Sequence, residues 1–551
     1  MVVAVVGAWV LLAAFVLAAW TRVATVRAWR VAALLLTLGF SLLHQLMFST
    51  LADDAFITFR YALNVADGYG PVFNPGDRVE GYVNFLWMLL IALPRAMFGG
   101  DVEAFAAVLG VLATLGCVLL AYFTANRVAA LALPEGARPR PALGVAAAVL
   151  TAGAGGLAVY GPSGMETPLF VLLVLAVCHA LAARRPVVAG VLVACAVMTS
   201  PDGLIVAVAA GGALAIAAVR GRHSWWVPGG YALGALVFLV PWTAWRVTYY
   251  HHLLPNSLVA RFGGPLGPQL SAGWRYLSGF SLVHQGFLLI GLVAVVALTV
   301  RRTLAGPAES GARSPIWLMF VLVLGLTAGV VVQGGDSAPS WRLLAVVPPL
   351  LAVASVATYG VLTTSAAMKP SPRPRFWTAG TRLLPTAAFG LTGIAVLVSI
   401  LSPDMLRRVG DLRTEGAQLG EVGSWLGGHL PPGSVVSASA TGVLAYRAGP
   451  QLQVVDVLGR TDEHIARDVA NDYEYVVNAR RPTLAVTTGT GYDQRQSCAM
   501  DPRYSGKYEA ATFRRAGTPY WITVYTRTEQ TKTLTSDLDT DPRFIYVACP
   551  R

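Results

Sequence analysis

The stretch VAALLLTLGFSLLHQLMFSTLADD, residues 31–54, passes from a long apolar run directly into two adjacent aspartates. The run is long enough to cross a hydrocarbon core about 30 Å thick. At its end the carboxylates of Asp53 and Asp54 repel each other and lose part of their hydration, which should raise the pKa of at least one of them. Ionisable groups at such a boundary usually serve a function, so this pair is the first candidate site. An ordinary interfacial helix with a capping aspartate would account for only one carboxylate.

Similar apolar runs recur over most of the chain. The protein has 551 residues, of which 55% are hydrophobic and 13% charged, and its mean hydropathy is +0.59, which excludes an ordinary soluble protein. The run near residues 3–20 lacks the basic start and the cleavage site of a signal peptide, so we expect a membrane helix there. We predict a polytopic α-helical membrane protein with about twelve spans, near residues 3–20, 31–50, 103–123, 142–160, 168–183, 187–200, 204–219, 227–247, 284–300, 315–333, 343–363 and 383–401.

The pattern changes after residue 401. Charge density rises there, and short runs of Val, Ile and Tyr alternate with Gly, Pro and Asp. We therefore predict two domains: a transmembrane domain over residues 1–401, with its first outer loop at 51–101, and a soluble α/β domain over 402–551. Strands are expected at 435–438, 452–457 and 484–487. No glycine-rich phosphate loop indicates nucleotide binding, so the soluble domain is expected to bind or orient an acceptor, or else to serve as a structural lid.

Basic residues gather in every second loop between the predicted spans. The net charge of +12 therefore indicates membrane topology rather than nucleic-acid binding, and these loops are predicted to be cytoplasmic. The Asp53 loop, the other loops that contain candidate residues and the C-terminal domain then lie outside the plasma membrane. The basic residues are Arg22, Arg27, Arg30, Arg127, Arg138, Arg140, Arg184, Arg185, Arg220, Arg222, Arg301, Arg302, Arg313, Lys369, Arg373, Arg375 and Arg382.

The five cysteines fall into two groups. Cys117, Cys178 and Cys195 lie inside apolar runs and are expected to be buried as small hydrophobic residues. Cys498 and Cys549 are the two in the C-terminal domain, and an extracytoplasmic location would allow a disulfide between them. No cysteine or histidine spacing indicates a zinc site.

The residues after the aspartate pair predict a short amphipathic helix. Phe56, Phe59 and Leu63 recur at helical spacing, so residues 55–66 should form a helix on the membrane surface, with Asp54 as its N-cap. Arg60 and Asn64 fall on the polar side of this predicted helix.

The first outer loop resembles that of the GT-C glycosyltransferases. The resemblance rests on DDAFITFRY at 53–61, GPVFNPG at 70–76 and RVEGY at 78–82, and it is greatest to bacterial enzymes grouped with the mycobacterial terminal arabinofuranosyltransferase and with protein-mannosyltransferase-like proteins. It implies a GT-C-like membrane enzyme that uses a polyprenyl-phosphate sugar as donor. Further matching segments are GMET at 164–167, PDG at 201–203, LPNS at 254–257, GGD at 334–336, WR at 341–342, and residues 456–466.

Transfer from such a donor requires two kinds of residue. A base must activate the acceptor hydroxyl, and cationic groups must stabilise the departing phosphate. Asp53 resembles the catalytic aspartate of the family, with Asp54 as its partner or as a metal ligand, and a retaining reaction would instead use a carboxylate as nucleophile. The phosphate candidates are Arg60, Arg342, His251, His252 and Asn256.

Four further carboxylates are candidates for binding the acceptor or the sugar: Glu80, Glu166, Asp202 and Asp336. Each has a simpler interpretation, because Glu166 and Asp202 stand where a helix cap is expected, Asp336 can pair with Arg342, and Glu80 can be solvated. The histidines can equally belong to an interfacial aromatic belt. Asp53, Asp54 and Glu166 offer oxygen ligands for magnesium or calcium, although a phosphate site made only of arginines would need no metal.

The sequence as a whole favours an integral membrane glycosyltransferase that acts on a cell-envelope glycan. Its expected partners are the lipid-phosphate donor, the glycan acceptor and membrane lipid. Arabinofuranose is the favoured sugar and mannose the alternative. A transporter is less favoured because the acidic residues gather at one face and no inverted repeat is visible. A receptor or scaffold would leave the paired aspartates unexplained.

Overall fold

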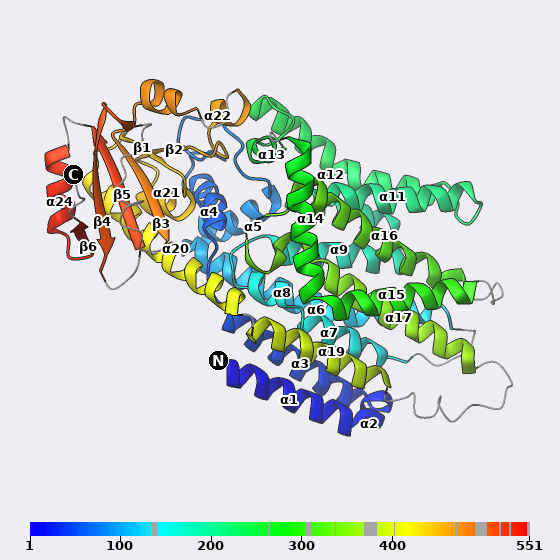
Figure 1. Ribbon diagram of the computed structural model, residues 1–551. Helices are drawn as coiled ribbons and strands as arrows, with labels where there is room; N and C mark the ends of the chain where they lie inside the picture. The colour runs from blue at the N-terminus through cyan, green and yellow to red at the C-terminus, as the bar shows by residue number, and fades with distance from the viewer. Residues whose placement is uncertain are drawn as a thin grey trace. The chain divides into compact units, whose positions relative to one another are not determined.

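The chain folds into two compact units (Figure 1). The first comprises Met1–Thr50, Ala106–Ala244 and Gly264–Val409, and the second comprises Leu51–Phe105, Trp245–Gly263 and Gly410–Arg551. The first outer loop thus belongs to the same unit as the C-terminal domain, whereas the sequence had placed it with the membrane helices. The computed structural model describes residues 1–133, 140–262, 265–302, 310–336, 338–367, 383–401, 403–468, 472–490, 504–516, 520–527 and 531–547.

The first unit consists of helices in the residues that the structure describes. Two of the helices below continue into the second unit, α6 at its start and α12 at its end. The helices are α1 (Val2–Ala18), α2 (Trp20–Thr25), α3 (Arg27–Met47), α6 (Val102–Ala130), α7 (Leu143–Ala152), α8 (Gly155–Tyr160), α9 (Thr167–Ala182), α10 (Pro186–Thr199), α11 (Gly203–Val219), α12 (Trp226–Tyr250), α14 (Leu266–Val283), α15 (Gln285–Arg302), α16 (Ser310–Gln333), the 3-10 segment η2 (Pro339–Leu344), α17 (Val347–Ala367) and α19 (Leu383–Leu401).

Every predicted span coincides with helical structure, although the span at 142–160 is divided between α7 and α8. Among the described residues, five helices are long and apolar enough to cross a membrane, or six if the bent pair α14 and α15 forms one span. Shorter apolar helices, including α9, α10 and α11, account for other predicted spans. Several apolar spans are therefore confirmed, and the number twelve stays a prediction.

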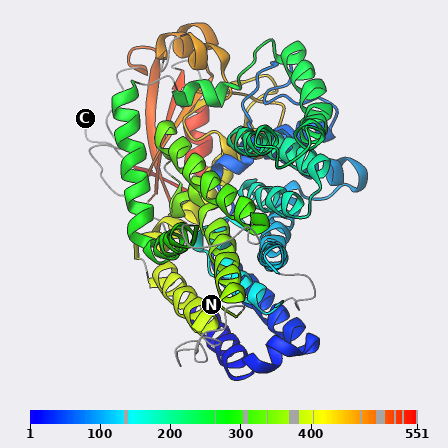
Figure 2. The ribbon, with the colours of Figure 1, turned by 90° about the vertical axis from the view of Figure 1, so that its right-hand side faces the viewer.

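The core of the first unit is the segment from η2 into α17. In one apolar 18-residue window within Pro339–Thr363, 94% of the residues are buried, compared with 17% in the corresponding window of α12. Other helices of this unit contact one another in pairs, such as α9 with α10 and α14 with α16. Helices α1 and α3 lie side by side in both views of the ribbon (Figures 1 and 2). Residues 340–343 of η2 are half-buried beside this core, so their polar side chains lie partly inside protein, where they need partners.

The second unit combines a sheet with short helices. Its strands are β1 (Val435–Ala438), β2 (Gln453–Asp456), β3 (Leu484–Thr490), β4 (Tyr508–Arg515), β5 (Tyr520–Arg527) and β6 (Phe544–Val547). Its helices are α4 (Asp53–Ala66), α5 (Phe85–Phe98), α13 (Asn256–Phe262), most of α20 (Pro403–His429), α21 (Gly442–Ala448), α22 (Glu463–Arg467), the π-helical turn η3 (Tyr475–Arg480) and α24 (Thr531–Thr540).

The six strands lie in the order β2-β1-β3-β5-β4-β6. β1 pairs in parallel with β2 and β3, and the pairs from β3 through β6 are antiparallel. Because side chains alternate along a strand, Val486 and its partner Val524 meet Trp425 of α20 on one face, whereas Ala485 and its partner Tyr525 pack on the other face. The predicted strands correspond to β1, β2 and β3, so the C-terminal α/β fold is confirmed in outline.

Helix α4 differs from the amphipathic helix that the sequence predicted. It begins at Asp53, and its N-cap residue is Ala52, so Asp54 is not the cap. The supposedly polar Arg60 and Asn64 are both buried, because α21 and the loop after α4 cover that side of the helix. Amphipathic spacing alone did not reveal that this polar side would be covered.

The loop after α4 completes the edge of the sheet. The side-chain amide of Asn74 donates to the Val454 carbonyl oxygen at 3.0 Å, and its own oxygen accepts from the Val454 N–H at 3.0 Å. Asn74 therefore pairs with the edge strand β2 as a neighbouring strand would. This contact explains why the loop and the C-terminal residues form one unit.

Two predictions about cysteines have different outcomes. Cys117 and Cys178 are buried free thiols and Cys195 is half-buried, in agreement with their positions in apolar runs. Cys498 and Cys549 lie outside the described residues, so their disulfide stays a prediction.

Candidate active site

Asp53 stands in the first turn of α4 and is half-buried. Its Oδ1 accepts a hydrogen bond of 2.8 Å from the backbone N–H of Val443, at the start of α21. Burial raises the pKa of Asp53 and the nearby Asp54 raises it further, against lowering by the Val443 hydrogen bond and by Arg460. Gly442 makes this approach possible, because a Cβ there would lie 2.0 Å from the Asp53 carbonyl oxygen. Asp53 is thus a carboxylate with an increased affinity for protons.

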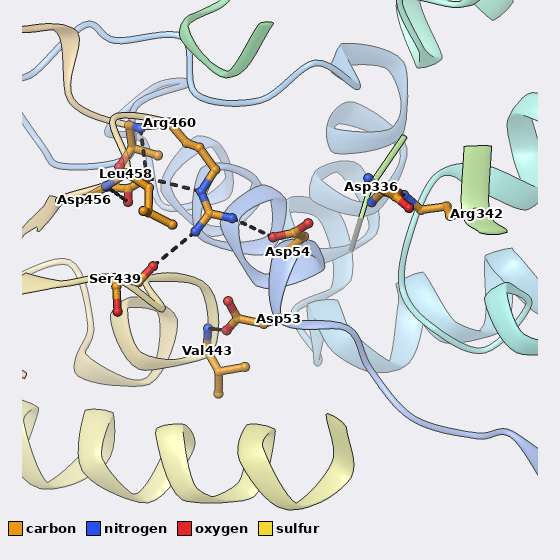
Figure 3. Close-up of polar contacts among 10 residues, drawn as sticks. Asp53, Asp54, Asp336, Arg342, Ser439, Val443, Asp456, Leu458 and Arg460 are labelled. Atoms are coloured by element: carbon orange, nitrogen blue, oxygen red, sulfur yellow. Dashed lines mark hydrogen bonds and ion pairs between the residues drawn. The ribbon is translucent and has the colours of Figure 1, made fainter. Parts of the chain in front are cut away.

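Asp54 lies in a different environment although it is the next residue. Its side chain is 48% exposed, and its Oδ1 accepts from Nη1 of Arg460 at 2.7 Å (Figure 3). Two neighbouring carboxylates in different surroundings are a usual arrangement in acid–base catalysis.

Arg460 is held in place by a buried carboxylate on its other side. Nε of Arg460 lies 3.4 Å from Oδ2 of Asp456, which is fully buried at the end of β2, and Nη2 lies 3.4 Å from the Ser439 carbonyl oxygen (Figure 3). Asp456 also accepts from the backbone N–H groups of Leu458 and Thr461. Burial raises the pKa of Asp456, while Arg460 and these two hydrogen bonds oppose the shift.

The loop that carries Arg460 is fixed by close contact with the first outer loop. A Cβ at Gly81 would lie 2.6 Å from Cγ2 of Thr461 and 2.9 Å from the Arg460 carbonyl oxygen. The backbone N–H of Gly81 donates to the Tyr61 hydroxyl at 2.9 Å. The position of Arg460 therefore depends on residues that are far away in the sequence.

Arg60, a predicted phosphate ligand, is buried and already surrounded by acceptors. Its Nε donates to the Phe73 carbonyl oxygen at 2.7 Å, and Nη2 donates to the Leu452 carbonyl oxygen at 2.8 Å. Nη1 donates to the Ala445 carbonyl oxygen, and Nη2 also contacts Asn74. Burial lowers the pKa of Arg60 to about 9, so it stays cationic at neutral pH. These contacts suit a tether between segments rather than a ligand site, and we leave Arg60 out of the proposed site.

Glu80 and Asn256 are also buried in contacts with protein. The Glu80 carboxylate forms two hydrogen bonds of 2.7 Å with Arg246. Asn256 donates its backbone N–H to the Glu80 carbonyl oxygen and accepts from Arg467 at 2.9 Å through its side chain. Both residues join α12 and α13 to the first outer loop and to α22.

The two histidines after α12 are exposed to different degrees. His251 is exposed and has a positive φ of 60°, so it reverses the chain at the end of the helix. His252 Nε2 lies 2.5 Å from Oε1 of Glu463, and both of these side chains are well exposed. The His252 pair links the segment after α12 to α22.

The remaining candidates lie in the first unit. Arg342 pairs through Nε with Oδ2 of Asp336 at 2.9 Å, and both side chains are largely buried (Figure 3). Asp202 precedes α11 and accepts from Gln333 of α16 at 2.7 Å. Glu166 precedes α9, and its side chain forms no capping hydrogen bond. The Asp336–Arg342 pair is the one that the sequence had suggested.

The sequence was compared with protein families and with characterised proteins. A family model described as a domain of unknown function, DUF8728, matches residues 408–525. The terminal beta-(1->2)-arabinofuranosyltransferase of Corynebacterium glutamicum is 29% identical over 313 residues, which cover 52% of this chain and 45% of that protein. The chain therefore spans less than half the length of that relative.

Two solved structures share the architecture. ArnT from Cupriavidus metallidurans bound to undecaprenyl phosphate matches with a TM-score of 0.52 and 14% identity, over 90% of this chain and 97% of that one. The archaeal oligosaccharyltransferase AglB from Archaeoglobus fulgidus, in complex with an inhibitory peptide and a dolichol-phosphate, matches with a TM-score of 0.51 and 11% identity, over 93% and 75%. Both are GT-C glycosyltransferases.

This chain has the GT-C fold. The fold that the resemblance of the first outer loop implied is thereby confirmed, because the two structures match at least nine-tenths of the chain. Within this GT-C fold, Arg460 and Asp456 were missed as individual site residues, although the matching segment 456–466 contained them. The usable signal was a buried strand that ends in an aspartate, with an arginine four residues later.

The predicted metal ion stays a prediction. Among the described residues, the structure brings together no group of three His, Cys, Asp or Glu side chains suited to a metal ion. The predicted set of Asp53, Asp54 and Glu166 combines residues of two units. Asp53 accepts from the Val443 N–H and Asp54 pairs with Arg460, so these two carboxylates have separate partners.

Proposed function

We propose that the protein is an integral membrane glycosyltransferase that moves a sugar from a polyprenyl-phosphate donor to a hydroxyl of a cell-envelope glycan. The observation that carries this proposal is the different surroundings of two adjacent carboxylates, Asp53 against the Val443 N–H and Asp54 against Arg460. The fold shared with ArnT and AglB supports the proposal, since their structures contain undecaprenyl phosphate and dolichol-phosphate.

In the proposed reaction Asp53 is the general base. It accepts the proton of the acceptor hydroxyl while that oxygen attacks the anomeric carbon of the donor. The bond between the anomeric carbon and the phosphate oxygen breaks, and the lipid phosphate leaves with the bonding electrons. Asp54, which pairs with Arg460, raises the proton affinity of Asp53 through repulsion between the two carboxylates. A retaining reaction would use Asp53 as the nucleophile instead.

Arg342 is our candidate for the donor phosphate. Its guanidinium is largely buried and pairs with Asp336 through Nε, and guanidinium groups form strong charge-assisted hydrogen bonds with phosphate oxygens. A magnesium or calcium ion on Asp53 and Asp54 would supply further stabilisation of the departing phosphate. Removal of divalent ions with EDTA and their re-addition tests for such an ion.

Arabinofuranose is the favoured donor sugar, and the identity to the Corynebacterium arabinofuranosyltransferase supports it. The alternative is mannose. The decisive experiment offers the purified protein polyprenyl-phosphate arabinofuranose, polyprenyl-phosphate mannose and the sugar-free lipid, and analyses the linkage in the product. Transfer of arabinofuranose supports the first assignment, and transfer of mannose alone replaces it. No transfer from any donor, in protein shown to be folded, contradicts the proposal and leaves a transporter as the alternative.

We also propose that the Asp53 loop and the C-terminal domain lie outside the plasma membrane, as the distribution of arginines predicts. Leu458 is 49% exposed beside Arg460, and Arg222 is exposed in a loop predicted to be cytoplasmic. After native thiols are blocked, a cysteine at position 458 should react with an impermeant reagent in intact cells, and one at position 222 should react only after lysis. The reverse pattern would contradict this topology.

A further inference from the structure

Three unusual features coincide in the first unit, where α14 faces η2. The chain turns by 88° between α14 and α15, and His284 stands at this break. Ser340 and Trp341 both have left-handed backbones, with φ values of 59° and 49°. Left-handed residues other than glycine and broken membrane helices are both more frequent at binding sites than elsewhere.

Side-chain packing brings these features together. Tyr276 and Phe280 share one face of α14, and the ring of His284, the C-cap residue of this helix, lies 4.7 Å from that of Phe280, measured between centroids. The ring of Trp341 lies 5.9 Å from that of His284 and 6.4 Å from that of Phe280, measured between centroids. The backbone N–H of Leu343 donates to the Tyr276 hydroxyl at 3.3 Å. Segment 340–343, which includes Arg342, is therefore packed along this face.

Three polar atoms in this region are buried without a hydrogen-bond partner among the described residues. They are Nδ1 of His284, whose residue is only 8% exposed, Oγ of Ser340, and Oδ1 of Asp336, the residue that pairs with Arg342. Buried polar atoms are almost always paired, and the two of these three that can donate, on His284 and Ser340, call for an additional acceptor. Arg342 adds a cation that is bound through Nε to Asp336.

We propose that His284 and Ser340, together with Arg342, recognise a lipid-linked phosphate, with His284 Nδ1–H and the Ser340 hydroxyl donating to its oxygens. The chemistry favours this ligand, because the site offers hydrogen-bond donors and a guanidinium, and phosphate has several acceptor oxygens. The apolar faces of Phe280 and Trp341 suit the first carbons of a lipid chain. The inference rests on the proposed function for the donor's identity, and it adds two residues to Arg342.

The same chemistry fits two sources, the polyprenyl phosphate of the donor and the headgroup of an ordinary anionic phospholipid. We commit to the donor. The strained turn comes directly before Arg342, and strained backbones are found at specific ligand sites. A site for bulk phospholipid would not require such a backbone.

The test measures lipid binding and turnover on the full chain in zwitterionic nanodiscs. His284→Leu removes the hydrogen bond and keeps an apolar side chain, whereas His284→Asn returns an N–H close to Nδ1. We expect His284→Leu to weaken binding of sugar-free polyprenyl phosphate roughly tenfold and to raise KM for the donor by a similar factor, with kcat within about twofold. Ser340→Ala should act in the same direction with a smaller factor, and His284→Asn should restore most of the loss.

Controls and outcomes separate this inference from the proposed function. His223→Leu, at an exposed histidine, should change neither constant. Unchanged polyprenyl-phosphate binding in folded His284→Leu and Ser340→Ala proteins overturns the inference, even if sugar transfer is observed. Loss of phosphatidylglycerol binding with unaltered polyprenyl-phosphate binding overturns the donor assignment. Binding that depends on His284 in a protein that transfers no sugar supports the site and contradicts the proposed function.

Discussion

The carboxylate–guanidinium pairs Glu80–Arg246 and Asp54–Arg460 lie in the same unit and differ in nearly everything except distance. Glu80 and Arg246 form two hydrogen bonds of 2.7 Å and are both buried. Asp54 and Arg460 form one contact of 2.7 Å, and the Asp54 side chain is 48% exposed. The first pair holds segments together, whereas the second leaves a carboxylate accessible to solvent. A short ion pair therefore says little about function until its burial is known.

Breaking the buried pair should give the largest loss of stability. Glu80→Ala leaves the Arg246 guanidinium buried without its partner, which typically costs about 3–5 kcal/mol. We expect a clearly lower midpoint of thermal unfolding for the purified protein. Asp77→Asn, in the same loop, is the matched control: it removes a partly exposed 3.7 Å contact with Arg480 and should stay within about 1 kcal/mol of the wild type. Equal midpoints for the two variants would remove the contrast between the pairs.

The contact at Gly81 should give the next largest effect. The added Cβ in Gly81→Ala meets Thr461 at 2.6 Å and the Arg460 carbonyl oxygen at 2.9 Å, so the loop must shift. Overpacking of this kind typically costs about 1–3 kcal/mol, and turnover should fall because Arg460 moves away from Asp54. Gly416→Ala is the control, because nothing lies within 4 Å of its Cβ in α20. Full activity in Gly81→Ala would show that the position of the Arg460 loop does not matter.

The exposed pair should contribute little to stability. Asp54→Asn removes the partly exposed ion pair, which is worth at most about 1 kcal/mol, and Arg460 keeps its contact with Asp456. Chemical denaturation measures this difference. Arg460→Met should be more harmful to stability, because it leaves the buried Asp456 without its cation. A larger stability loss in Asp54→Asn than in Arg460→Met would contradict this division of roles.

The pH dependence of turnover sharpens the comparison further. A general base works only when ionised, so turnover should rise with pH as Asp53 loses its proton, above the ordinary aspartate range because its pKa is raised. Asp54→Asn removes a neighbouring negative charge and should move this acid limb to lower pH. A pH–rate profile at saturating donor measures the acid limb of the wild type and of Asp54→Asn. An acid limb that moves upward in Asp54→Asn would show that repulsion between the two carboxylates is not what sets it.

The sequence indicated the parts of this molecule that depend on local pattern. Apolar runs located helices such as α3 and α6, and short β-branched runs located β1 and β3. The aspartate pair was visible because it follows an apolar run directly. Such features need only neighbouring residues.

Contacts between distant segments could not be predicted in this way. Arg60 looked like a surface cation, yet it donates to carbonyl groups of Ala445 and Leu452, nearly four hundred residues away. Arg460 reaches Asp54 across a similar separation. The side that a helix buries depends on what packs against it, and a spacing pattern does not contain that information.

The measurement that tests the account most directly is turnover of Asp53→Asn at saturating donor. Asn keeps the shape of the side chain but cannot take the proton, and general acid–base groups typically contribute about 10² to 10⁴ in rate. We predict a loss of that size, with the midpoint of thermal unfolding near that of the wild type. Asp67→Asn, at the other end of α4, should remain fully active. Nearly full turnover in Asp53→Asn would contradict the assignment of Asp53 as the catalytic base.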